Sequence, residues 1–116
     1  MQSSSERDSW LYVEDMCAFC ERVLAYTQDI ERDTFTADLM RFDATLRNLE
    51  LPGEAATHVP EDLRDRAPRV PWRQVIAMRN RLIHAYLGID SDTVWSIVHD
   101  DIPALHRDLL KLLATK

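Results

Sequence analysis

The sequence predicts an all-helical protein, and three observations support this fold class. Glycine occurs only twice in 116 residues, and this scarcity favours helices over sheets with glycine-rich turns. Apolar residues recur at three- and four-residue spacing along most of the chain. Hydrophobic residues make up 46% of the sequence, which is enough for one core. We therefore expect a single all-α domain over residues 8–116, preceded by a short disordered head at residues 1–7.

A first helix is expected from Asp8 or Ser9, either of which can cap it, to about Ile30. Its apolar residues form one stripe that a core would bury. The stripe includes Cys17 and Cys20, which lie three residues apart, where a disulfide between them would be strained. No second pair of ligands follows at the spacing of a zinc finger. We therefore expect both cysteines to be core residues rather than a redox or metal site.

A second helix is expected to begin near Thr34, after the polar connector 31–33. Pro52 has no amide hydrogen and its ring clashes with the preceding turn, so we expect a kink or a break there and a short continuation over 54–56. Residues 58–71 contain three of the five prolines and should form a loop around a short helix over 61–66.

The next helix is expected over residues 71–86, because Pro71 suits the first turn of a helix and Gly88 suits the end of one. A further helix can be capped by Asp90 or Ser91.

The last helix carries a leucine-rich stripe that begins at Ile102. Pro103 either begins this helix or bends a longer one.

The net charge of −6 is unevenly distributed. Residues 64–84 contain six arginines and one acid, a local charge of +5, so the remainder of the chain carries −11. This asymmetry is compatible with a phosphate-binding patch, although arginine clusters also form structural ion pairs. No apolar run approaches the roughly 20 residues of a membrane span, and the chain does not start with a signal-peptide pattern. We therefore expect a cytoplasmic protein without a membrane segment.

The segment 79–86, with the sequence RNRLIHAY, carries the candidate chemistry. On an ideal helix, His84 and Asn80 lie on the polar face, whereas Arg79 falls inside the apolar arc, about 40° from Val75. A guanidinium cannot lose its water without a partner, so Arg79 needs a nearby acid, a subunit interface or a ligand phosphate.

Arg79 and His84 together suit RNA cleavage without a metal. A neutral imidazole can take the proton of a ribose 2′-OH or return one to the leaving 5′ oxygen. A guanidinium can hold phosphate oxygens by two parallel hydrogen bonds. No cluster of ligands for a catalytic metal is visible, and no cofactor is expected. The structural alternatives are an ion pair of Arg79 with Glu50 or Glu54 and a histidine that merely faces solvent.

Residues five apart lie about 140° apart around a helix, so one helix aims Arg79 and His84 awkwardly at a single phosphate. Two copies of the helix related by a two-fold axis would bring both pairs into a shared cleft. We therefore expect a homodimer whose interface includes residues 71–86. Asn80 can orient the imidazole or bind phosphate. Arg73 and Arg81, on the polar side of the same helix, are candidate RNA contacts.

The spacing R-x-x-x-x-H-x-Y, formed by Arg79, His84 and Tyr86, resembles the active-site motif of the HepT-like HEPN toxins. The similarity covers roughly residues 10–113 and extends in order and spacing to further segments. They are 47–50 (RNLE), 53–56 (GEAA), 71–73 (PWR), 78–84 (MRNRLIH), 88–90 (GID) and 94–95 (VW). Two positions depart from the pattern. Pro52 interrupts a stretch that is usually continuous apolar helix, and Ala85 stands where glycine is common.

The resemblance implies a HEPN-type up-and-down bundle of four to five helices that dimerises and cuts RNA, either tRNA or mRNA, at the dimer interface. It also implies the toxin of a type VII-like toxin–antitoxin pair, whose partner is an MntA-type minimal nucleotidyltransferase. In this family the antitoxin silences the toxin by transferring AMP from ATP, with Mg²⁺, onto the motif tyrosine, which matches Tyr86 here.

Two other classes of protein stay open. A non-catalytic helical partner that presents substrate to a nucleotidyltransferase would share the dimer but would not cut RNA. A structural four-helix bundle would use Arg79 only in an ion pair. A neighbouring reading frame that encodes a short nucleotidyltransferase would favour the toxin family.

Overall fold

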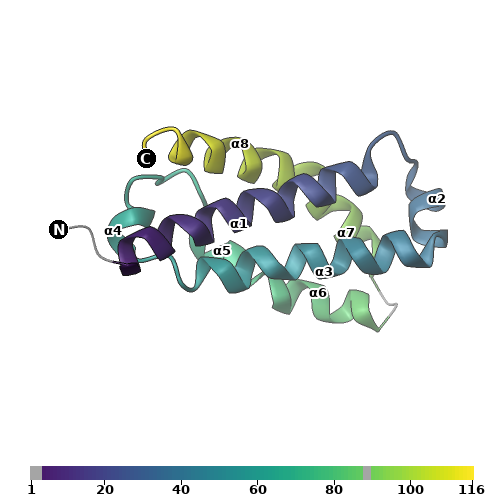
Figure 1. Cartoon of the computed structure of the whole chain (residues 1–116). Coiled ribbons are helices and arrows are strands. Elements are labelled where there is room, and N and C mark those ends of the chain that lie inside the picture. Colours follow the sequence, from purple (N-terminus) through teal and green to yellow (C-terminus); the bar gives the residue numbers. More distant parts are fainter. Residues whose placement is uncertain (1–3, 88–89) are drawn as a thin grey trace.

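The computed structural model describes residues 4–87 and 90–116, apart from the side chains of Ser4, Ser5, His84 and Tyr86, and every regular element in these ranges is a helix. The all-α prediction is confirmed. Long helical segments run alternately up and down an elongated bundle of 51 × 26 × 22 Å (Figure 1). The helices before the C-terminal segment are α1 (Ser4–Thr27), α2 (Arg32–Ala37), α3 (Leu39–Ala56), α4 (Glu61–Arg64), α5 (Trp72–Ile76) and α6 (Met78–Tyr86).

Helix α1 begins at Ser4, four residues before the expected start at Asp8, so residues 4–7 of the predicted head form its first turn. Glu6 lies in this turn, where its negative charge interacts favourably with the positive end of the helix dipole. The helix ends at Thr27 rather than near Ile30. Asp29 follows with a φ of 55°, a left-handed conformation that turns the chain away from the helix axis.

The second predicted helix is two helices, and the interruption lies at Asp38 rather than at Pro52. Asp38 has extended backbone angles, and its side chain accepts a hydrogen bond of 3.1 Å from the amide of Arg41, which caps α3. Helix α3 then continues through Pro52 to Ala56. Of the kink or break expected at Pro52, the break is therefore wrong, and residues 54–56 continue α3 itself. Pro52 is buried, and α3 lies along α1 (Figure 1), so tertiary packing outweighs the lost backbone hydrogen bond.

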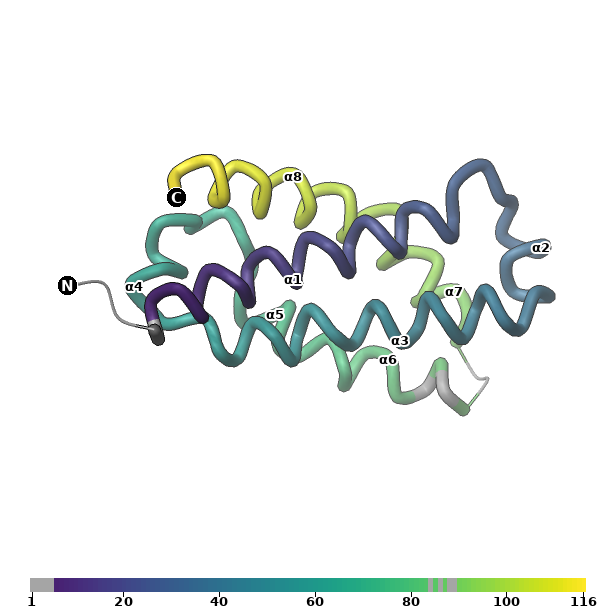
Figure 2. The backbone as a smooth tube through the Cα atoms, in the orientation of Figure 1, coloured from purple at the N-terminus to yellow at the C-terminus, as the bar shows by residue number. Residues whose placement is uncertain are grey.

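The predicted helix over 71–86 is also two helices, α5 and α6, separated at Ala77, whose φ of −80° and ψ of 1° lie outside the helical region. The interruption occurs where α5 meets α3. A Cβ atom added to Gly53 of α3 would lie only 2.7 Å from the carbonyl oxygen of Val75. The last turn of α5 thus packs closely against the backbone of α3, and the chain changes direction after it (Figure 2).

The C-terminal segment runs without interruption through α7 (Ser91–Ser96), the π-helix η1 (Ile97–Asp101) and α8 (Ile102–Leu113). Asp90 caps α7 through a 3.0 Å hydrogen bond from the amide of Thr93, as the sequence predicts. Pro103 lies in the first turn of α8, directly after the π-helix. Pro103 therefore begins α8, at a position where the missing amide hydrogen costs little, and α8 itself continues directly from the π-helix.

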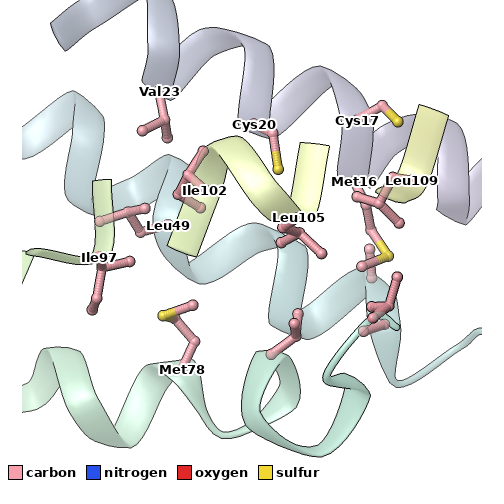
Figure 3. Close-up of a cluster of buried hydrophobic side chains, with 14 of the residues drawn as sticks. Met16, Cys17, Cys20, Val23, Leu49, Met78, Ile97, Ile102, Leu105 and Leu109 are labelled. Atoms are coloured by element: carbon pink, nitrogen blue, oxygen red, sulfur yellow. The ribbon is translucent and has the colours of Figure 1, made fainter. Parts of the chain in front are cut away.

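The core lies between α1, α3, α6, η1 and α8, and Figure 3 shows their buried side chains converging. Cys17 and Cys20 belong to this core and are not bonded to each other. Burial raises the pKa of Cys17 to about 11 and that of Cys20 to about 12. Because the thiolate is the reactive form of cysteine, neither side chain is suited to redox or metal chemistry. The prediction that both are core residues is confirmed.

Among the helices of the described ranges, none combines the length and the apolar character that a bilayer crossing requires.

Candidate active site

Helix α6 carries the motif and is held against the core along one side. Met78, Leu82 and Ala85 are buried, and their spacing of four and three residues places them on one face. Met78 extends from α6 into the cluster that contains Leu49 of α3 and Ile97 of η1 (Figure 3). Packing of this face against the core therefore fixes the position of α6, and with it the position of the motif residues on the exposed side of the helix.

Arg79 lies on the exposed side of α6, and 79% of its side chain is accessible to solvent. The sequence placed it inside an apolar arc shared with Val75, and this placement is wrong. The arc assumed one helix, whereas the interruption at Ala77 separates α5 from α6. On α6 itself, Arg79 is about 100° from the buried Met78. Its guanidinium therefore keeps its water and stays open to a ligand.

Glu50 of α3 is the acid next to Arg79. The Nε atom of Arg79 lies 4.0 Å from Oε1 of Glu50. The Nη1 atom of Arg47, one turn earlier on α3, lies 3.7 Å from Oε2. Of the two acids that the structural alternative names, Glu50 is thus the partner. A long contact made by a largely exposed arginine contributes little to stability, so an ion pair alone does not account for Arg79.

His84 and Tyr86 lie in α6, but their side chains are outside the described residues, so the predicted catalytic and acceptor positions stay predictions. Asn80 is exposed, and its backbone N–H donates a 2.9 Å hydrogen bond to the carbonyl of Ala77. The contact expected between Asn80 and His84 also falls outside the description.

The two arginines predicted to contact RNA point to different parts of the molecule. Nη1 of Arg81 lies 2.9 Å from Oδ2 of Asp101, so this side chain reaches toward η1 rather than toward α3. Arg73 is exposed on α5, where it lines an open groove of about 620 Å³ together with Trp72 and Arg64. The structure therefore does not bring either of them to Glu50 beside Arg79.

Two other members of the arginine cluster have structural roles. Arg64 donates hydrogen bonds of 2.8 Å to the carbonyls of Val59 and Ala56, which closes the C-terminal end of α3. Arg66 donates a 2.7 Å hydrogen bond to the carbonyl of Thr115 and so ties the loop to the end of the chain. Arg64, Arg66 and Arg81 thus each have partners of their own in different parts of the chain.

The sequence did not identify Arg47 as a site residue, although its guanidinium faces the same carboxylate, that of Glu50, as Arg79 does. The signal for it is the i,i+3 pair of opposite charges at positions 47 and 50, the spacing of neighbours on one helix face. Across the part of the chain that the structure describes, no group of three or more His, Cys, Asp or Glu side chains could hold a metal ion.

Comparison with known proteins identifies similar chains. The model of the family described as "Ribonuclease HepT-like" matches residues 16–112. A protein of Methanocaldococcus jannaschii named "Putative RNase MJ1380" is 35% identical over 105 residues, which cover 90% of this chain and 96% of the relative. "Probable ribonuclease HepT" of Thermococcus cleftensis is 38% identical over 101 residues, 87% of this chain and 92% of the relative. No solved structure is significantly similar to the chain.

Proposed function

The chain belongs to the HepT-like ribonuclease family, and from this premise we propose that it is an endoribonuclease that uses Arg79 and His84 and needs no metal ion. The observation that carries the proposal is the exposed stripe of α6. Arg79, Ile83 and Leu87 follow one another at four-residue spacing, and all three are exposed. A guanidinium available to phosphate therefore stands beside apolar side chains on a helix that the core holds in place.

The chemistry is a transesterification followed by release of the cut strand. His84 takes the proton of the ribose 2′-OH while the 2′ oxygen forms a bond to phosphorus. The bond from phosphorus to the 5′ oxygen breaks, and a protonated imidazole returns a proton to that oxygen. The products are a 2′,3′-cyclic phosphate and a 5′-OH. Arg79 holds the nonbridging oxygens as their negative charge increases, and Asn80 supports the site from one turn before His84.

A second copy of the chain is the partner that fits the exposed stripe. Ile83 is 56% exposed, and Leu87 is more so, although both are large apolar residues. Pairing two α6 helices across a two-fold axis covers these side chains and brings both Arg79 and both His84 residues to one cleft. The active enzyme is then a homodimer with a composite site for its RNA substrate.

Control of the activity follows the family resemblance. The protein is the toxin of a type VII-like toxin–antitoxin pair, and an MntA-type minimal nucleotidyltransferase transfers AMP from ATP, with Mg²⁺, onto Tyr86. An AMP group two residues after His84 brings a phosphate within reach of a site built for phosphate and blocks RNA. Mass spectrometry after incubation with that enzyme tests this step. Wild type should gain AMP on Tyr86 and lose activity, and Tyr86→Phe should do neither.

The decisive experiment is an RNA cleavage assay with purified wild type and His84→Ala. Wild type should cut a pool of mature tRNA or mRNA equally well with and without EDTA. His84→Ala should fold normally and have no activity. Activity that EDTA removes and added metal restores would contradict the metal-independent mechanism. A wild type that binds RNA without cutting it would favour the non-catalytic substrate-binding partner instead.

A further inference from the structure

Glu50 lies between two arginines that come from different helices. Arg47 precedes it by one turn on α3, and Arg79 reaches it from α6. Each carboxylate oxygen faces a different guanidinium, because Oε2 is 3.7 Å from Nη1 of Arg47 and Oε1 is 4.0 Å from Nε of Arg79. One carboxylate therefore places two guanidinium groups of different origin on the same part of the surface.

The burial of the three side chains differs sharply. Only 14% of the Glu50 side chain is exposed, against 62% for Arg47 and 79% for Arg79. The carboxylate thus lies between α3 and α6, whereas the guanidinium groups face solvent. Two positive charges share one negative charge, so the cluster retains a charge of about +1. Both contacts are too long for hydrogen bonds, so they do not use up the N–H donors of either guanidinium.

We propose that Arg47 is a second phosphate-binding residue of the ribonuclease site, and that Glu50 is a positioning residue that holds Arg47 and Arg79 beside each other. This inference rests on the proposed function, because it takes RNA as the ligand of Arg79. Two guanidinium forks can hold two oxygens of one phosphate or two successive phosphates of a strand. Arg47 thereby adds binding, and Glu50 keeps Arg79 oriented for the reaction.

Arg107 provides a matched control for Arg47. Its side chain is also 62% exposed, and it also pairs with an acid of its own helix, with Nε 3.8 Å from Oδ1 of Asp108. It lies on α8, whereas Arg47 lies on α3. Loss of a surface charge and of a local ion pair is therefore common to Arg47→Ala and Arg107→Ala, but proximity to Arg79 belongs to Arg47 alone.

The first test measures binding separately from cleavage. Each arginine variant is made in the His84→Ala background, and its affinity for a pool of mature tRNA is measured over a range of KCl concentrations. Arg47→Ala should weaken binding on the order of 10-fold. The slope of log K against log[salt] is negative, and its magnitude should decrease by about one. Arg47→Lys should restore the slope because it keeps the charge. Equal behaviour of Arg47→Ala and Arg107→Ala would overturn the role of Arg47.

The second test separates positioning from binding. Glu50→Gln removes a negative charge next to the RNA, so the affinity for tRNA should stay equal or increase. Its kcat should nevertheless fall about 10-fold or more, because the carboxylate no longer orients Arg79. A merely structural role predicts that activity and binding fall together with the folded fraction, which circular dichroism and thermal melting measure. An unchanged kcat, or a loss of both in proportion to unfolding, would overturn the role of Glu50.

The results also distinguish this inference from the proposed function. If wild type cuts tRNA and Arg79→Ala does not, while Arg47→Ala and Glu50→Gln match wild type, the inference fails and the proposed function stands. If wild type binds tRNA without cutting it and only Arg47→Ala weakens binding, the phosphate contact stands and the enzyme assignment fails. If wild type neither binds nor cuts tRNA or mRNA, both fail.

Discussion

At the scale of single residues, the environment of Arg79 decides its role. The same guanidinium would need a buried partner if it faced the core, because an unpaired buried charge is costly. It instead faces solvent beside Glu50 and Arg47. A largely exposed arginine with one long ion pair has little effect on folding. Its exposure beside the apolar side chain of Ile83 is therefore not explained by stability, and it agrees with the ligand and the second copy that we propose.

Arg79→Ala should abolish RNA cleavage and leave the fold nearly unchanged. We expect the rate to fall on the order of 100-fold or more, because a phosphate-holding donor is lost in the transition state. The free energy of unfolding should change by less than about 0.5 kcal/mol. Cleavage kinetics and urea denaturation measure the two effects, and Arg79→Lys, which keeps the charge without the fork, should be intermediate. A stable variant with wild-type cleavage would exclude Arg79 from the site.

Gly53→Ala should destabilise the protein because the added Cβ would lie 2.7 Å from the carbonyl oxygen of Val75. Backbone atoms cannot rotate away, so α3 and α5 must separate. We expect a loss of ~1–3 kcal/mol in the free energy of unfolding. Glu54→Ala, at the next and exposed position of α3, is the control and should change it little. Equal stability of the two variants in urea denaturation would show that the close approach carries no constraint.

At the scale of elements, the separation of α5 from α6 positions the candidate site. Trp72 anchors α5, since its Nε1 donates a 3.1 Å hydrogen bond to the carbonyl of Ala67 and its ring is buried. Helix α6 then begins after Ala77 with its own buried face. The opposite side of α6 carries Arg79 and Ile83 into solvent. An element with one packed face and one partly apolar exposed face is suited to a subunit interface.

Ile83→Asp should convert the proposed dimer into a monomer and remove RNA cleavage with it. A carboxylate in the centre of a two-fold interface meets its own copy, and like charges repel. The fold should survive because Ile83 is 56% exposed in the single chain. Leu110→Asp on α8, another exposed apolar position, is the control and should remain dimeric and active. Sedimentation and cleavage assays measure both properties, and a wild type that is monomeric with full activity would refute the dimer.

At the scale of the whole molecule, the core joins segments that are distant in the sequence. Helices α1 and α8, from opposite ends of the chain, lie side by side (Figure 1). An ion pair also joins the end of the chain to α1, with Nζ of Lys116 2.8 Å from Oε1 of Glu14. The two cysteine thiols lie in this core, so their ionisation is coupled to the unfolding of the molecule as a whole.

The stability of the protein should fall at alkaline pH because of Cys17 and Cys20. Burial raises their pKa values from 9.0 to about 11 and about 12, so the folded state holds these protons more tightly than the unfolded chain. The resulting stabilisation is complete below pH 9.0 and is lost as the pH rises through the folded values. Urea denaturation from about pH 8 to about pH 10.5 under reducing conditions should show a steep decline for wild type. It should be shallower for Cys17→Ala/Cys20→Ala, and parallel declines would contradict this coupling.

By itself, the sequence determined the features that depend on near neighbours. Helix period and glycine content predicted the all-α class, a local cap predicted the start of α7 at Asp90, and the apolar stripe of α1 predicted the burial of both cysteines. The motif spacing predicted the family. Each of these depends on residues a few positions apart, where backbone geometry relates spacing directly to direction.

Only the tertiary structure decided the features that depend on contacts between distant segments. The continuation of α3 through Pro52 depends on packing against α1, and the interruption at Ala77 depends on the approach of Gly53. The sequence left Glu50 and Glu54 open as partners of Arg79, and the packing of α6 on α3 decides for Glu50, 29 positions away. The physical reason is that packing free energy between helices exceeds the local preference of a proline or of an unbroken turn.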